Sequence, residues 1–246
     1  MGRAKEEWMR QQELEPMYEW IEENYGDDVG EEGSETWKQA AQAYEDRCEE
    51  LQRQEAEWYE QEEIEWYIYT QSQAGKFDIQ ILSVLELLDM QASSEAKFSL
   101  LVMLHGHIVA AVESYLASTF IHKVTNSEEL IRKLVETDPV FSNKKFTMKE
   151  IYEKHESLKL TVAAYLRDLI FHNLEKVKPM YKNVLGCDFG DISWLFEAVK
   201  IRHHCVHRAG LDQDGYRVNL SKESIRDLAH SSSKLVHAVE ARVDKI

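Results

Sequence analysis

The chain has few residues that break helices or cross-link loops. Among its 246 residues are only three prolines, ten glycines and three cysteines. So few helix breakers, together with long stretches of apolar residues at helical spacing and few alternating runs, predict an all-α fold. The cysteines are odd in number, widely spaced and without a CxxC pair. They are therefore expected to be reduced cytosolic thiols rather than a disulfide framework.

The sequence also lacks the short motifs of several large enzyme classes. It contains no GxxxxGK[ST], GxGxxG or GxSxG pattern. These motifs build loops that cradle phosphates or hold a nucleophilic serine, so their absence argues against a P-loop NTPase, a dinucleotide-binding enzyme and an α/β-hydrolase. No HExxH pattern occurs either. We expect neither a cofactor nor a bound metal.

No long apolar stretch is free of polar groups. Residues 1–7 lack the apolar core of a signal peptide, so we expect a cytoplasmic protein. The most apolar stretch, residues 98–121, contains His105, His107 and Glu113. A membrane-spanning helix of about twenty residues rarely carries such groups without a partner. We therefore expect this stretch to be the buried central helix of a bundle, and we expect no membrane contact.

Negative charge is distributed unevenly along the chain. The formal net charge is −16, but residues 1–93 hold 25 Asp and Glu against 7 Lys and Arg, whereas residues 94–246 hold 20 against 22. Such asymmetry is typical of an acidic arm attached to a near-neutral domain. We therefore predict an acidic helical arm over residues 1–76 and a helical domain over residues 77–246, with a linker near residues 73–76.

The expected N-terminal arm is acidic but rich in tryptophan. This aromatic content does not fit a disordered segment. Residues 34–69 carry an apolar stripe at three- and four-residue steps with glutamates on the other faces, which predicts a long amphipathic helix. The stripe either packs on the main domain or a twin subunit, or the carboxylates mimic nucleic acid and cover a functional groove. Five of the six tryptophans of the chain lie in the arm: Trp8, Trp20, Trp37, Trp58 and Trp66.

Chemically active side chains concentrate in residues 201–210, which read Ile-Arg-His-His-Cys-Val-His-Arg-Ala-Gly. The run ends an expected helix that begins near Asp191, and a glycine is a common residue just past a helix end. Arg202 falls near the middle of the apolar arc of that helix. Its guanidinium therefore needs a carboxylate, a phosphate or a wet cleft. His203 and His207 share one edge of the same arc, so the arginine and both imidazoles are expected to border one groove.

The pattern from Arg202 to His207, an arginine and a histidine separated by four residues, resembles the signature of the HEPN superfamily. Most members of that superfamily are ribonucleases of RNA processing, toxin–antitoxin and phage-defence systems. The context is similar too, because an Asp-Gly turn and a strand-like stretch at residues 216–220 precede a terminal helix opened by Ser221. The resemblance covers about residues 97–246. It implies a HEPN-like helical bundle with a short β-hairpin near the C-terminus.

The resemblance, read with the chemistry of these side chains, implies metal-independent cleavage of RNA by attack of the 2′-hydroxyl on the adjacent phosphate. His207 is expected to transfer protons, since an imidazole with a pKa of about 6.5 can do so at neutral pH. Arg202 is expected to hold the phosphate and stabilise the transition state, with His203 orienting or assisting. Glu113 is the expected partner of Arg202, and Arg208 a supporting residue. The resemblance also implies a homodimer in which two motif helices face each other.

Three lysines and a tyrosine precede the motif helix: Lys176, Lys178, Lys182 and Tyr181. Cations and an aromatic ring are the groups with which a single-stranded RNA site holds phosphates and stacks a base. Solvent exposure alone explains the lysines equally well. RNA binding by this segment is therefore a hypothesis.

Several functions stay open at this point. The first is a ribonuclease acting as a toxin or phage-defence effector, with RNA as its substrate and an antitoxin or sensor protein as a further partner. The second is a HEPN-like module that binds RNA, a nucleotide or a partner without cutting. A zinc site on His203 and His207 is the third, although no third ligand is apparent in the sequence. The last is a structural helical protein whose histidines are incidental.

Overall fold

The computed structural model describes residues 3–69, 73–91, 93–143, 157–169 and 171–246. Most of these residues lie in helices, and no named strand occurs among them, so the all-α prediction is confirmed. The chain forms two compact units, Met1–Glu63 and Ile64–Ile246. The boundary lies inside a helix. Residues 73–76, where a linker was expected, instead form the first turn of helix α3 (Gln73–Leu88).

The first unit is a pair of helices joined by a short turn. Helix α1 (Arg3–Tyr25) leads through a 3-10 helix, η1 (Gly26–Val29), into α2 (Glu35–Tyr69), whose last six residues belong to the second unit. Met17 and Ile21 of α1 and Ala40 of α2 form a small buried cluster. Two aromatic pairs lie around it, with ring centroids 5.6 Å apart for Trp20 and Tyr44 and 6.0 Å apart for Tyr18 and Trp37.

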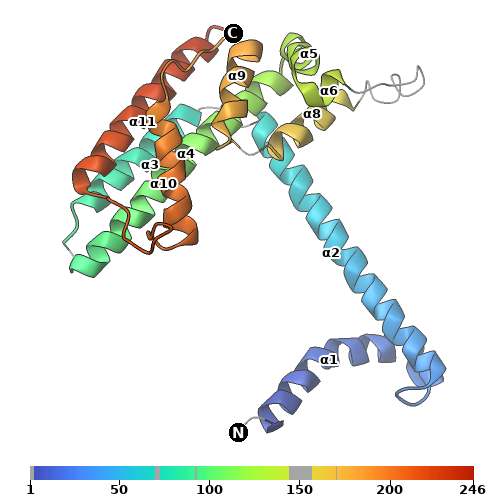
Figure 1. Cartoon of the computed structure of the whole chain (residues 1–246). Helices are drawn as coiled ribbons and strands as arrows, with labels where there is room; N and C mark the ends of the chain where they lie inside the picture. The colour runs from blue at the N-terminus through green and yellow to red at the C-terminus, as the bar shows by residue number, and fades with distance from the viewer. Residues whose placement is uncertain (1–2, 70–72, 92, 144–156, 170) are drawn as a thin grey trace. The chain divides into compact units, whose positions relative to one another are not determined.

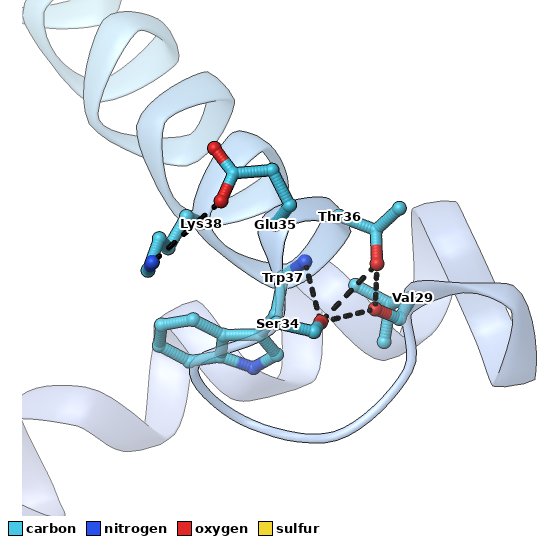
Figure 2. A network of polar contacts seen from close by, with 6 residues as sticks. All are labelled: Val29, Ser34, Glu35, Thr36, Trp37 and Lys38. Atoms are coloured by element: carbon cyan, nitrogen blue, oxygen red, sulfur yellow. Dashed lines mark hydrogen bonds and ion pairs between the residues drawn. The ribbon is translucent and has the colours of Figure 1, made fainter.

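Helix α2 begins where the sequence predicts it, because Ser34 caps its N-terminus (Figure 2). The Ser34 hydroxyl accepts a hydrogen bond from the backbone N–H of Trp37 at 3.2 Å, and it donates to the carbonyl of Val29 at 3.2 Å. The Thr36 hydroxyl donates to the same carbonyl at 2.6 Å. These bonds satisfy a backbone donor that has no partner inside the first helical turn. They also tie the end of η1 to the start of α2.

The second unit is a helical bundle built around α4 (Ser94–Thr125). In Figure 1, α3, α10 and α11 lie beside α4, and the other helices gather near its C-terminal part. The remaining helices among the described residues are α5 (Glu128–Thr137), α6 (Pro139–Ser142), α8 (Leu158–Arg167), α9 (Leu174–Leu185), α10 (Ser193–His207) and α11 (Lys222–Val243).

Helix α4 is the central helix that the sequence predicts. It begins after Ser93, whose hydroxyl accepts from the backbone N–H of Ala96 at 3.4 Å. By length and composition it could cross a membrane, the one described helix of which this is true, but 56% of its most apolar window is buried inside the protein. Ile108, Leu116 and Phe120 are fully buried. An apolar helix covered by neighbours on several sides is the expected core of a bundle.

The short β-hairpin predicted near the C-terminus is not present in residues 171–246, all of which the structure describes. Residues 208–221 form a loop that contains one isolated antiparallel bridge, between Leu211 and Arg217. The Asp212 carboxylate accepts from the backbone N–H groups of Asp214 and Tyr216, both at 2.9 Å, and this closes a tight turn. The Tyr216 side chain is 72% exposed. A two-stranded hairpin without a packed face is marginal in water, which explains why the strand prediction was wrong.

Candidate functional site

Helix α10 packs closely on α4 at the motif. A Cβ added at Gly106 of α4 would lie only 3.9 Å from a methyl carbon of Val206. This close approach brings Arg202 of α10 to Glu113 of α4, with 3.2 Å between the guanidinium Nη1 and the carboxylate Oε1. The two side chains are 25% and 16% exposed. The contact suggested by the sequence is therefore present and mostly shielded from solvent.

A third side chain, that of His172, lies next to the Arg202–Glu113 pair. His172, in the segment just before α9, places its Nδ1 3.7 Å from Oε2 of Glu113. Glu113 therefore lies between a guanidinium and an imidazole. The sequence alone does not point to His172, because this residue lies 30 residues before Arg202 and no spacing relates it to the motif. Only the packing of three segments around Glu113 identifies it.

Burial dominates the electrostatics of this cluster. It raises the pKa of Glu113 to about 7, against the lowering effect of Arg202. Burial and the positive charge of Arg202 both lower the pKa of His172. The Nε of Arg202 is also buried and has no hydrogen-bond partner among the described residues. The cluster thus holds a carboxyl group that titrates near neutral pH beside a guanidinium that is not fully satisfied.

The motif imidazoles lie on the exposed side of α10. His203 and His207 are both exposed, and their ring centroids are 4.8 Å apart. Partial desolvation, and then the charges of His207, Arg208 and His204, lower the pKa of His203. Arg208 is exposed as well, with its Nη1 3.3 Å from Nδ1 of His204. The end of α10 therefore presents several basic groups to solvent.

One chain does not bring Arg202 and His207 into a single groove. Five residues apart, the two side chains leave α10 about 140° from each other. Arg202 contacts α4, whereas His207 is exposed. The expected shared groove is therefore not formed within one chain.

Two apolar side chains of α10 are exposed near the imidazoles. Phe196 is 41% exposed and Val206 is 58% exposed. Phe196 lies seven residues before His203 and eleven before His207, a spacing that puts the three on one stripe of the helix. An exposed stripe that mixes aromatic, aliphatic and imidazole groups is typical of a surface that another molecule covers.

Tyr181 cannot serve as a base-stacking residue in this structure. Its side chain is fully buried, and its hydroxyl donates to the carbonyl of Leu116 at 2.6 Å. Its ring packs against Phe120 and Phe189, with centroids 5.0 and 4.8 Å away. The hypothesis failed because α9 is amphipathic and Tyr181 lies on its buried face, among core residues that the local sequence does not reveal.

The three lysines of the same segment make local contacts. Lys178 donates to the carbonyl of Gly190 at 2.6 Å, and Lys182 lies 2.9 Å from a carboxylate oxygen of Asp188. Both contacts hold the loop between α9 and α10. Lys176 donates to the hydroxyl of Tyr165 at 2.8 Å. These partners account for the lysines without a phosphate, so their RNA-binding role stays a hypothesis.

The donor set around the motif does not form a metal cluster. Among the described residues, no group of three or more His, Cys, Asp or Glu side chains is placed to hold one ion. His203 and His207 lie close to each other, but Cys205, between them in sequence, faces the protein interior and is 6% exposed. The zinc interpretation therefore has two adjacent imidazoles and no third ligand within the described chain.

Taken together, fold and site define an all-α protein with a shielded Arg–Glu–His cluster between helices and an exposed pair of histidines on the same motif helix. No known protein family, curated protein or solved structure matches the chain. A function for it therefore depends on the motif and on the contacts described above.

Proposed function

We propose that the chain is a HEPN-type, metal-independent endoribonuclease. The observation that supports this most directly is that α10 carries a partly buried arginine and two exposed histidines. Arg202 contacts Glu113 on the central helix, while His203 and His207 stay exposed within the following five residues. A permanent cation and a titratable base on one short helix are the two groups that phosphodiester cleavage without a metal needs.

In the proposed reaction the 2′-hydroxyl attacks the adjacent phosphate in line. His207 transfers protons between the attacking and leaving oxygens, and His203, 4.8 Å away between ring centroids, orients or assists it. Arg202 compensates the charge that develops on the phosphate oxygens through its paired N–H donors. The products are a 2′,3′-cyclic phosphate end and a free 5′-hydroxyl. Glu113 positions Arg202, and Arg208 adds positive charge near the site.

The proposed enzyme is a homodimer with a composite site. The Arg202 and His207 side chains of one protomer leave α10 on different faces, so a single chain does not present both to one phosphate. Pairing of two α10 helices would set the imidazoles of both protomers side by side and cover Phe196 and Val206, which are exposed in one chain. Apolar groups around a polar centre suit such an interface.

The family resemblance supplies the biological setting of the proposal. It favours a cytoplasmic toxin or phage-defence effector whose substrate is RNA and whose activity an antitoxin or sensor protein controls. The second unit, where the site lies, is nearly free of the strong negative charge of the first, because residues 64–246 hold 24 Asp and Glu against 23 Lys and Arg. An approaching RNA is therefore not repelled by the domain that carries the motif.

A second candidate is a HEPN-like module that binds RNA, a nucleotide or a partner without cleaving it. The favouring observation is the state of Arg202, whose side chain is only 25% exposed and already paired with Glu113. An arginine held by a carboxylate is less available for a phosphate. Binding without turnover would follow if that pair does not open.

Cleavage of a labelled RNA by the purified chain in EDTA tests the proposal. We expect Arg202→Ala and His207→Ala each to reduce the rate by about 10²-fold or more, the usual contribution of a positioned acid–base or charge-stabilising group. His230→Ala, an exposed histidine on α11, is the matched control and should cut at the wild-type rate. The expected product end is a cyclic phosphate.

Three results would count against the proposal. RNA binding without cleavage by the wild type would favour the second candidate. Loss of activity in EDTA that zinc or magnesium restores would favour a metal-dependent reaction. Both variants could also cleave RNA at the wild-type rate while helix content and melting temperature stay unchanged. That result would show that Arg202 and His207 take no part in catalysis.

A further inference from the structure

Helix α2 carries an apolar stripe that is only partly covered. Trp37, Tyr44, Leu51 and Trp58 follow one another at seven-residue steps, so they lie along one face of the helix. The first two pack near α1, where Trp37 pairs with Tyr18 and Tyr44 with Trp20. In Figure 1, α1 lies near only the first turns of α2, and the rest of α2 extends away from α1. The part of the stripe that contains Leu51 and Trp58 is therefore not covered by α1.

The uncovered part is strongly exposed. Every residue from 51 to 63 is exposed, and Leu51 and Trp58 have 50% and 59% of their surface accessible. Tyr59, whose ring lies 5.0 Å from that of Trp58, is 57% exposed. A helix with no covered face has little support beyond its own hydrogen bonds. Large apolar groups repeated on such a helix are typical of a surface that binds a partner.

Charge restricts what can bind there. Residues 45–63 contain nine Asp and Glu against two arginines, a net charge of −7. Both arginines are already engaged within the first unit, Arg47 over the ring of Trp20 at 5.6 Å and Arg53 in an ion pair with Glu50. Glu55 and Glu62 lie four residues after Leu51 and Trp58, on the stripe itself. The apolar groups therefore lie in a stretch where carboxylates far outnumber cations.

This charge pattern disfavours three classes of occupant. A nucleic acid and an anionic membrane would both be repelled by it. A second copy of α2 would place the glutamates of the stripe against each other, and like charges across a helix seam are destabilising. A partner with apolar residues in a helical stripe and with lysines or arginines on both sides of it would match the surface in shape and in charge.

We propose that residues 48–62 of α2 form a docking surface for a basic amphipathic helix of a partner protein. Leu51 and Trp58 contact the apolar face of that helix, and the surrounding carboxylates pair with its cations. The proposal does not depend on the ribonuclease function, because every residue that carries it lies outside the domain with the motif.

Binding of fluorescently labelled peptides to the full-length chain tests the proposal. One peptide of about six helical turns carries a leucine stripe flanked by lysines, the second carries the same stripe flanked by glutamates, and the third has the residues of the first in scrambled order. We expect the fluorescence anisotropy of the lysine peptide to rise when it binds. We expect its affinity to fall as salt approaches physiological strength. The glutamate peptide should not bind, and the scrambled peptide should bind at least about tenfold more weakly, since it cannot align an apolar face.

Variants of the chain distinguish binding through the apolar stripe from non-specific electrostatic attraction. Leu51→Gln combined with Trp58→Gln keeps a good helix former at both positions and removes the apolar contact. We expect it to weaken binding of the lysine peptide by about tenfold or more, because two large side chains are no longer buried. Ala56→Gln, about 140° from Leu51 around the helix, introduces the same residue off the stripe and should leave binding unchanged.

Three outcomes would overturn the docking proposal. The first is equal binding of the lysine peptide to the wild type and to the double variant. The second is equal binding of the glutamate and lysine peptides. The third is sedimentation showing that the wild type self-associates and that the double variant does not, which would assign the stripe to a second copy of the chain.

Discussion

Gly210 follows the motif helix with a backbone conformation and a packing contact that other residues do not tolerate. Its φ is +84°, and an added Cβ would lie 2.5 Å from a methyl carbon of Val102 and 3.0 Å from the ring of Phe98. Gly215 has a similar φ of +83° but nothing within 4 Å of the same position. Both glycines therefore adopt a positive φ that other residues rarely take, and only at Gly210 would a side chain also clash with its neighbours.

Alanine at each position separates these two effects. We expect Gly215→Ala to lower the free energy of unfolding by about 1–2 kcal/mol through the backbone alone. Gly210→Ala should cost about 1–3 kcal/mol more, because Val102 and Phe98 must move. Urea unfolding of both variants measures the difference. Equal losses would mean that the loop adjusts without disturbing α4.

Glu113 predicts how stability depends on pH. Its pKa in the folded chain is about 7, above its ordinary value of 4.5. Between these two values the folded state holds a proton that the unfolded state has released. Raising the pH through this window therefore lowers the free energy of unfolding, and the full penalty is reached above pH 7. Glutamine at this position has no proton to lose.

We expect the stability advantage of the wild type over Glu113→Gln to shrink as the pH rises from 5 to 8. Glu175→Gln, at an exposed position of α9, serves as the control and should follow the wild type. Chemical unfolding at several pH values gives the comparison. A constant difference between wild type and Glu113→Gln would show that burial does not control the charge of this carboxyl group.

At the scale of elements, the end of α2 belongs to the bundle rather than to the arm. Ile64 and Ile68 are buried and cluster with Ala163 of α8. The carbonyl of Ile68 also lies 2.7 Å from Nδ1 of His122 and accepts from the amide of Asn126 at 2.9 Å. These contacts satisfy a carbonyl at the C-terminus of α2, which has no partner inside the helix. They explain why the unit boundary lies inside α2.

Two truncated chains test this assignment. A chain starting at Glu63 keeps Ile64 and Ile68, whereas a chain starting at Gln73 removes them and exposes the surface of α8 that they cover. We expect the second to unfold with a free energy lower by about 3–6 kcal/mol, from two buried isoleucines at about 1.5–3 kcal/mol each. Thermal and urea unfolding of both chains provide the measurement. Equal stability would place the last turns of α2 with the arm.

At the scale of the whole molecule, the proposed site requires two copies of the chain. We expect the wild type to be a dimer and Phe196→Glu to be a monomer without ribonuclease activity, since Phe196 is exposed on the stripe of His203 and His207 and a charge there would be buried unpaired at the interface. Ile79→Glu is the matched control. Ile79 is 66% exposed on α3, so the same charge there should leave mass and activity unchanged.

Light scattering and RNA cleavage on the same samples decide this prediction. A wild-type monomer that cleaves RNA would contradict the composite site. A Phe196→Glu variant that stays dimeric and active would move the interface away from α10, even if the ribonuclease function holds.

Features governed by local physics could be predicted from the sequence alone. The scarcity of proline and glycine and the helical spacing of apolar residues determine an all-α chain. Ser34 and Ser221 begin helices as expected, because a cap needs only a hydroxyl and the backbone donors within the next three residues. The length and apolar character of residues 98–121 also identify the central helix. Each of these features depends on neighbours close in the chain.

Other features depend on residues distant in sequence, and only the tertiary structure decided them. Tyr181 is buried because α4 covers it, although its own segment is polar enough to predict exposure. His172 joins Glu113 and Arg202 because three separate segments meet there. The strand-like residues 216–220 form no hairpin, since a strand needs a partner and a packed face that composition does not reveal. Burial and pairing are set by long-range packing, and they determine which side chains of this protein are available for chemistry.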